Sequence, residues 1–202
     1  MSSFFHAIYK SLGYLLCKIC LVYWNLRDLF CKPRERSILF VTHPDDDTLF
    51  FHTFIKDNKP YVVLMTTGWS LKRMPDFFKA MKLYGVRYRA YPLESREKRE
   101  EVLEKIVERM LSRNSYEFCV THNVEGEYGH EAHKMVHDAV ARVSIIPVYA
   151  PALCKEMSKY PLSQSDVEEK IAMFKKVYTT ESWVIDEYSF WLTHEKLVEN
   201  IK

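Results

Sequence analysis

Glycine is scarce in this sequence, which has only 5 glycines and 8 prolines among its 202 residues. This composition excludes collagen-like and linker-like chains, and a hydrophobic share of 48% with 28% charged residues excludes a disordered one. The sequence also lacks any GxGxxG or GxxxxGKS/T motif. A doubly wound nucleotide-binding protein, one alternative for such a chain, therefore has no visible loop for cradling phosphate.

A large excess of charge of one sign is absent as well. Lysine and arginine number 29 and aspartate and glutamate 27, so the net charge is +2 and nucleic acid is not expected as a partner. Five cysteines, an odd number scattered along the chain, do not form a disulfide framework. They favour a reducing compartment, and we predict a cytoplasmic protein.

Residues 1–36 differ from the rest of the chain in charge and hydrophobicity. Six basic and two acidic side chains give this segment +4, which leaves about −2 for residues 37–202. Lys10 and Lys18 interrupt its apolar run, so a membrane span is the weakest interpretation. A signal peptide fits poorly, because no basic region precedes the run and no small-residue cleavage site follows it. We predict an appendage over residues 1–36 and one domain over residues 37–202.

The apolar residues of segment 4–30 recur at helical spacing and share one face, while Lys10 and Lys18 lie on the other and Pro33 ends the helix. This pattern favours peripheral association with a membrane surface, where lysines meet anionic head groups. Packing on the protein's own core or on a partner chain is the alternative. Cys17 and Cys20 form a CxxC without a second pair, so they fill the helix face rather than bind zinc. The apolar face comprises Phe5, Ile8, Leu12, Leu15, Leu16, Ile19, Val22, Tyr23, Leu26 and Phe30.

From residue 37 onward, short apolar runs alternate with segments of helical spacing. Strands are expected over 37–42, 61–67, 86–91, 117–121 and 145–150, and helices over 46–57, 73–84, 95–113, 130–143 and 165–177. Gly85 suits a helix end, Ser95 suits an N-cap, and Ser165 with Glu168 forms a capping box. This alternation predicts an α/β fold, with a Rossmann-like, mostly parallel sheet and helices on both faces.

Two polar clusters follow predicted strands. His43-Pro44-Asp45-Asp46-Asp47 comes directly after the first, and Gly129-His130-Glu131-Ala132-His133 follows the fourth by about ten residues. Ligands in such sheets bind beyond the carboxyl ends of strands, near a topological switch point. Taken alone, the first cluster is either part of a metal site or an acidic cap of the next helix.

In the second cluster, His130, His133 and His137 share one helical face, which is hard to explain as core. Solvated surface histidines are the alternative. A zincin metalloprotease, which needs the motif HExxH, is excluded in both possible registers. If the motif began at His130, Lys134 would stand in place of the second histidine, and if it began at His133, Lys134 would stand in place of the glutamate.

The combination of HPDD after one strand and GHxxH after a later one resembles the PIG-L/LmbE-like N-deacetylases. Arg73-x-x-Asp76-Phe77, continuing to Gly85-Val86, is similar to that family's RxxEL…LGV helix, and Thr66-Thr67-Gly68 is similar to its T-x-G turn. The resemblance spans roughly residues 37–180. It implies a zinc-dependent enzyme that removes acetyl from N-acetylglucosamine-type groups, with another divalent metal as an alternative to zinc.

The resemblance also implies roles for individual residues. His43, Asp46 and His133 match the metal ligands, which leaves one coordination position open for hydrolysis. Asp45 matches the general base, and His130 matches the residue that stabilises the oxyanion and assists the leaving amine. Arg73 and Tyr128 match residues that are expected to contact the substrate.

One departure is Asp47, where the family has glutamate, and this puts the support of the ligands in doubt. His122 and His137 have no assigned role. For Trp69 and Trp183, core packing is favoured over stacking on a sugar.

The expected substrate is an N-acetylated amino sugar, either soluble or lipid-linked, such as N-acetylglucosaminyl-phosphatidylinositol. The amphipathic front helix favours the lipid-linked form. The alternative function is a non-catalytic, membrane-recruited sugar- or metal-binding module with a retained pocket. Asp45 argues against that alternative, because a degenerate member would be expected to lose its base or a ligand.

Overall fold

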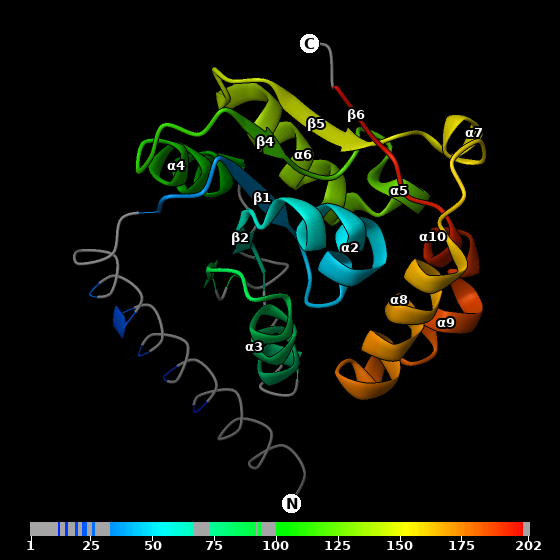
Figure 1. Cartoon of the computed structure of the whole chain (residues 1–202). Coiled ribbons are helices and arrows are strands. Elements are labelled where there is room, and N and C mark those ends of the chain that lie inside the picture. The colour runs from blue at the N-terminus through cyan, green and yellow to red at the C-terminus, as the bar shows by residue number, and fades with distance from the viewer. Residues whose placement is uncertain are drawn as a thin grey trace, which may run out of the picture.

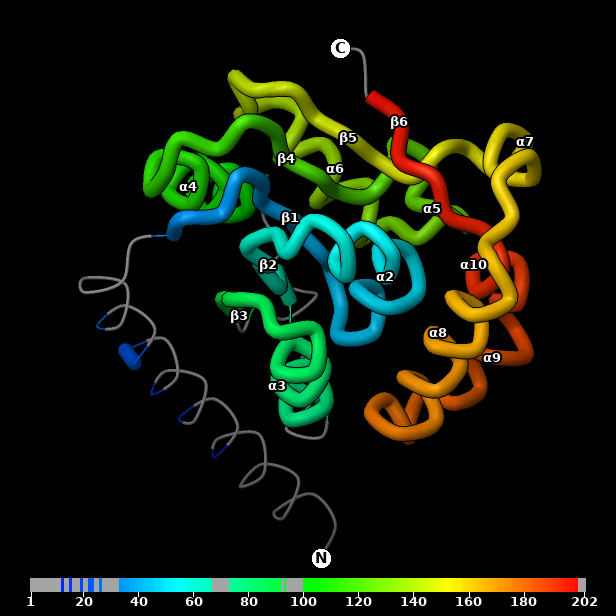
Figure 2. The backbone as a smooth tube through the Cα atoms, in the orientation of Figure 1, coloured from blue at the N-terminus to red at the C-terminus, as the bar shows by residue number. Residues whose placement is uncertain are grey.

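The computed structural model describes residues 33–66, 73–91, 93 and 100–199, together with Leu12, Leu15, Ile19, Val22, Tyr23 and Leu26. Six strands within these residues form one sheet in the order β3-β2-β1-β4-β5-β6. Strands β1 to β5 are parallel, and β6 runs antiparallel to β5 along the edge (Figure 2). The strands are β1 Ser37–Val41, β2 Tyr61–Leu64, β3 Tyr88–Ala90, β4 Phe118–Val120, β5 Val148–Pro151 and β6 Leu197–Glu199.

Helices cover both faces of this sheet, as the sequence predicts (Figure 1). Helices α2, α3 and α8 pack on one face, and α4 and α6 pack on the other. The helices are α2 Asp46–Asn58, α3 Arg73–Tyr84, α4 Glu100–Leu111, α5 Gly126–Gly129, α6 Glu131–Val143, α7 Cys154–Met157, α8 Gln164–Lys176, α9 Val184–Glu187 and α10 Ser189–Thr193, with a 3-10 turn at Thr179–Glu181.

Strand β1 shows why the apolar runs of this sequence are continuous rather than alternating. Leu39 and Val41 face the core on the α2 side, whereas Ile38 and Phe40 face the core on the α6 side, and all four are fully buried. A strand covered on both faces needs apolar side chains at every position. Each buried side chain of this size contributes about 1.5–3 kcal/mol to folding.

The order of the strands creates a switch point between β1 and β4. From β1 the chain passes to β2 on one side, and β4 later joins β1 on the other side. The crossover helices leave in opposite directions there, so the loops after β1 and β4 border one crevice. The two polar clusters of the sequence belong to these loops, which confirms that they meet at one edge of the sheet.

Several predicted boundaries are wrong by two or three residues. The N-cap of α8 is Ser163 rather than Ser165, because Ser163 Oγ accepts the amide of Asp166 at 3.2 Å. Strand β5 begins at Val148, and Ile145 is 98% exposed in the turn that follows α6. Gly85 adopts the predicted left-handed conformation with φ 68°. Strand β2 ends at Leu64, and Ser95 lies outside the described residues.

Most of the front segment, including Cys17 and Cys20, lies outside the described residues. The six described residues between 12 and 26 are helical, as predicted, and they are 50–60% exposed. Among the residues described, no helix has both the length and the hydropathy needed to cross a membrane.

A buried lysine holds the C-terminal segment to the rest of the domain. Lys170 of α8 is fully buried, and its ammonium donates to the carbonyl oxygens of Leu49 at 2.8 Å and Trp191 at 2.7 Å. Glu195 Oε2 lies 3.4 Å from the same nitrogen. Glu195 also accepts the amide of Phe54, so one ion pair joins α8, α10 and α2. A buried charge of this kind is tolerated only because every partner is in place.

Replacing Lys170 with methionine should lower the free energy of unfolding by about 3–5 kcal/mol, because Glu195 and two carbonyl groups would remain buried without their donor. Urea unfolding followed by circular dichroism measures this loss. The control is Lys175→Met, which removes an exposed lysine from the same helix. Equal stability of the two variants would show that the buried ion pair does not hold this segment.

Candidate metal centre

The first arm of the site is the loop between β1 and α2. It is tightly held, because the amide of His43 donates to Asp46 Oδ2 at 2.6 Å and Arg73 Nη2 donates to the carbonyl oxygen of Pro44 at 2.8 Å. Asp45 has φ 111°, a conformation that non-glycine residues rarely adopt. Such backbone strain clusters at functional sites, where the surrounding contacts maintain it.

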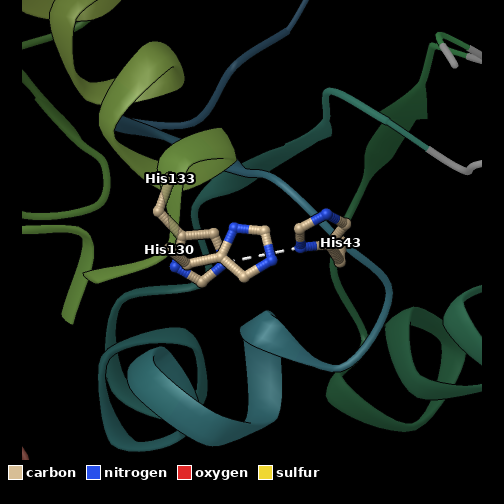
Figure 3. A group of neighbouring side chains, drawn as sticks. All are labelled: His43, His130 and His133. Atoms are coloured by element: carbon tan, nitrogen blue, oxygen red, sulfur yellow. Dashed lines mark hydrogen bonds between the residues drawn. The ribbon is translucent and has the colours of Figure 1, made fainter. Parts of the chain in front are cut away.

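The second arm begins after β4 and ends in the first turn of α6. His130 is the N-cap of α6, and its Nδ1 accepts the amide of Ala132 at 3.2 Å. His133 lies one turn further along and is fully buried. Figure 3 shows the rings of His130 and His133 projecting from α6 toward His43 on the opposite loop.

The three predicted metal ligands each contribute one donor atom to a small triangle. His133 Nε2 lies 3.3 Å from His43 Nδ1 and 3.4 Å from Asp46 Oδ2, and the last two atoms are 3.5 Å apart. Donors bound at about 2.0–2.1 Å to one tetrahedral zinc ion would stand about 3.4 Å from one another. Two imidazoles and one carboxylate also match a catalytic zinc site in chemistry. These residues therefore fit a divalent metal such as zinc.

His122 is a fourth imidazole at this place that sequence reasoning did not assign. Its ring stacks on that of His133, with centroids 3.9 Å apart, and its Nε2 lies 3.4 Å from Asp46 Oδ2. However, that nitrogen accepts the amide of Thr42 at 3.0 Å. Asp46, His122 and His133 lie close enough together to hold an ion, but His122 could supply Nε2 only by releasing the amide of Thr42, so we assign it to the support of the cluster.

Glu127 connects the two stacked imidazoles, and sequence reasoning missed it too. Its Oε2 lies 2.7 Å from His133 Nδ1 and 3.0 Å from His122 Nδ1, while its Oε1 accepts the amide of Asn123. The two imidazoles hold the pKa of this buried carboxyl at about 2 although burial opposes ionisation. An ionised Glu127 accepts a hydrogen bond from His133 Nδ1–H, which leaves Nε2 of that ring unprotonated on the side of Asp46.

The sequence did contain a signal for His122. The tripeptide Val-Thr-His ends both neighbouring strands, as Val41-Thr42-His43 after β1 and as Val120-Thr121-His122 after β4. The carboxyl ends of adjacent parallel strands lie at one edge of a sheet, so this repeat could have placed both histidines there, although the register sets Val120 beside Leu39 rather than beside Val41. Glu127 has no comparable signal, because its role depends on how the loop after β4 folds.

The three consecutive aspartates are all buried, and each has its own partners. Burial and the neighbouring Asp46 raise the pKa of Asp45 well above its usual range, although Arg73 opposes this with a 2.8 Å bond to Oδ1. For Asp46, burial opposes ionisation, but the surrounding imidazoles hold its pKa well below its usual range. Asp46 is therefore suited to hold a cation, and Asp45 to take up a proton.

Asp47 supports the loop despite being shorter than glutamate. Burial raises its pKa to about 6, against the hydrogen bonds that it accepts from Tyr178 at 2.6 Å and Thr48 at 3.0 Å. The Tyr178 hydroxyl thus reaches the shorter side chain, and Asp47 Oδ1 also accepts the amide of Asp45 at 3.3 Å.

A cavity of about 160 Å³ opens above these groups. The predicted site residues that line it are His43, Asp45, Asp46, Arg73, Tyr128 and His130, while His133 lies behind them. Leu49, Glu181, Trp183, Val184 and Tyr188 complete the lining. His137 is not among them, because one turn further along α6 its Nδ1 pairs with Asp138 at 3.0 Å.

Comparison with known proteins places the fold but not the family. No family model matches the chain. An uncharacterised protein, L374 of Acanthamoeba polyphaga mimivirus, is 20% identical over 186 residues, which cover 80% of this chain and 79% of that protein.

Similar solved structures include a triple mutant of Orf2*T, a deacetylase of the teicoplanin biosynthetic pathway, with a TM-score of 0.61 and 13% identity over 77% of this chain and 87% of that one. GalB, the 4-carboxy-2-hydroxymuconate hydratase of Pseudomonas putida KT2440, has a TM-score of 0.56 and 14% identity, and the match covers 83% of this chain and 97% of that one. The conserved protein TT1542 of Thermus thermophilus has a TM-score of 0.55 and 13% identity, and the match covers 83% of this chain and 95% of that one. The chain therefore shares the α/β fold of these proteins.

Replacing Glu127 with glutamine should weaken metal binding by about 10–100-fold, because His133 would lose the acceptor that fixes its ring. Competition with a chromogenic zinc chelator measures the affinity. Replacing His133 with alanine should weaken binding further, since it removes a donor atom. His137→Gln, a matched change one turn along α6, should bind zinc like the wild type. An unchanged affinity of the His133 variant would contradict this metal centre.

Proposed function

We propose that this protein is a metal-dependent hydrolase that removes acetyl from an N-acetylglucosamine-type group. The observation that carries the proposal is the triangle of His43, Asp46 and His133 donor atoms beside the buried carboxyl of Asp45. The fold shared with a deacetylase supports it. Within the PIG-L/LmbE-like pattern, the same three side chains are the expected ligands of zinc or another divalent metal.

An amide is a poor electrophile and water a poor nucleophile, so both need activation. A divalent metal bound by His43, Asp46 and His133 would polarise the acetyl oxygen and lower the pKa of water. Asp45 takes the proton of the attacking water, a role suited to a carboxyl whose pKa burial and Asp46 raise. Arg73 holds that carboxyl in place through its 2.8 Å bond to Oδ1.

In this proposal His130 acts on the other side of the scissile bond. Because its Nδ1 accepts the amide of Ala132, the proton of the neutral ring resides on Nε2. That N–H can donate to the acetyl oxygen as negative charge develops there. To pass a proton to the departing nitrogen as well, the ring must be protonated, with its Nδ1 released from the amide of Ala132. The C–N bond then breaks, and acetate and a free amine are the products.

Replacing Asp45 with asparagine should reduce kcat by about 10²–10⁴-fold while bound metal is retained, because only the proton acceptor is lost. The assay combines metal analysis with detection of free amine released from N-acetylglucosamine conjugates. Asp138→Asn, which neutralises a half-exposed carboxylate on α6, is the control. Full activity of the Asp45 variant would reject the base assignment, and a wild type that binds zinc but releases no amine would favour a non-catalytic binding module.

We further propose that the front segment associates with anionic membrane surfaces and brings the site near lipid-linked substrates. Leu12, Leu15, Ile19, Val22 and Leu26 support this, because they are helical and 50–58% exposed on what the sequence predicts as one face. The +4 charge of residues 1–36 adds attraction to acidic head groups.

Vesicle flotation tests this second proposal with phosphatidylcholine membranes that contain phosphatidylserine. The double variant L15E/I19E should lose binding, because each buried aliphatic side chain contributes about 1.5–3 kcal/mol. The variant S11E/N25E places the same two charges on the predicted polar face and should retain more binding. Equal flotation of both variants would contradict insertion of the apolar face.

A further inference from the structure

One side of the cavity above the metal centre is formed by aromatic rings. We refer to Tyr128, Trp183 and Tyr188, which line the cavity together, as the aromatic wall. The ring of Tyr188 packs against that of Tyr128 with centroids 4.5 Å apart and lies 5.9 Å from that of Trp183. Residues from two distant parts of the chain thus bring three aromatic rings together beside charged groups.

The aromatic wall is open to solvent, which core packing does not explain. Trp183 is 49% exposed and Tyr128 is 41% exposed, although both are large aromatic side chains. The sequence favours core packing for Trp183, but this interpretation is wrong, because about half of the side chain is exposed to solvent. Exposed aromatic faces next to a polar site are typical of a surface that binds a ligand.

A chain of ionic contacts fixes the orientation of the wall relative to the catalytic groups. The indole N–H of Trp183 donates to Glu181 Oε2 at 3.0 Å, and Glu181 Oε1 lies 3.1 Å from Arg73 Nε. Arg73 in turn donates to Asp45. Because these contacts anchor the indole by its edge, the apolar face of the ring remains available beside the site.

The chemistry of the cavity restricts the ligand that it fits. Imidazole, carboxylate and guanidinium groups form the floor, and aromatic carbon forms the wall. A pyranose ring has a matching division, with hydroxyl groups around its edge and C–H bonds on its face. At about 160 Å³, the cavity is also smaller than the roughly 300–1,000 Å³ of typical small-molecule sites, so it fits one ring rather than an extended ligand.

On the basis of the hydrolase function proposed above, we infer that Trp183 and Tyr188 are specificity-determining residues that bind the C–H face of the substrate's sugar ring. Arg73 and Glu181 then face the hydroxyl edge of that ring, and the acetamide reaches the metal centre. The group attached to the sugar extends past Trp183 into solvent. The wall therefore selects for the sugar ring that bears the acetamide, and it does not contact the acetyl group itself.

Saturation-transfer NMR and amine release with two probes test this inference. Methyl N-acetyl-β-glucosaminide carries the ring, and N-acetylethanolamine has the same amide without it. Trp183→Ala should weaken binding of the glucosaminide by roughly tenfold and raise its KM with little change in kcat, because a ring contact of about 1.4 kcal/mol is lost. Trp183→Phe keeps an aromatic face and should restore most of the binding. Tyr160→Ala, which removes an exposed aromatic ring elsewhere, should have no effect.

The two proposals fail in different ways. If the wild type binds and cleaves both probes equally and Trp183→Ala changes neither, the wall has no role in specificity, while the hydrolase function stands. If the wild type releases no amine but binds the glucosaminide in a Trp183-dependent manner, the wall is supported and the hydrolase function fails. Absence of glucosaminide binding to the wild type overturns the inference.

Discussion

The structure depends on how three consecutive aspartates are kept buried at the start of α2. Adjacent carboxylates repel one another and lose solvation, so each needs a different compensating group. Arg73 of α3 compensates Asp45, the imidazoles beyond β1 and β4 surround Asp46, and the hydroxyl of Tyr178 reaches Asp47. These partners come from separate parts of the domain, so the domain must be assembled before the cluster is stable.

The imidazoles around Asp46 are themselves supported from behind. Glu127 accepts from the two stacked rings of His122 and His133, and the backbone amide of Thr42 occupies the far nitrogen of His122. Their hydrogen bonds determine which nitrogen of each ring is bare. Metal affinity in such sites depends on these outer contacts as well as on the donor atoms. The fold thus holds these imidazoles through contacts on the side away from Asp46.

Local sequence patterns predicted the elements and the meeting of the two loops, because both follow from periodicity and from parallel-sheet topology. Helix α3, for example, occupies residues 73–84 as expected. Contacts between distant residues were beyond such reasoning. Nothing near Lys170 in the sequence indicates that its ammonium is buried and donates to two carbonyl oxygens of other helices instead of to water. The exposure of Trp183 and the support given by Glu127 likewise depend on how remote segments pack, which a single sequence does not record.

The reactive groups and the aromatic wall come largely from different parts of the chain. The proposed donor atoms and proton-transferring side chains belong to the loops after β1 and β4 and to the first turns of α2 and α6, whereas Glu181, Trp183 and Tyr188 belong to the C-terminal segment. The C-terminal segment is fastened to α2 by the ion pair of Lys170 and Glu195. Substitutions of Trp183 and Tyr188 could consequently redirect the choice of substrate while the proton-transferring groups stay the same, so new preferences can evolve without changing the chemistry.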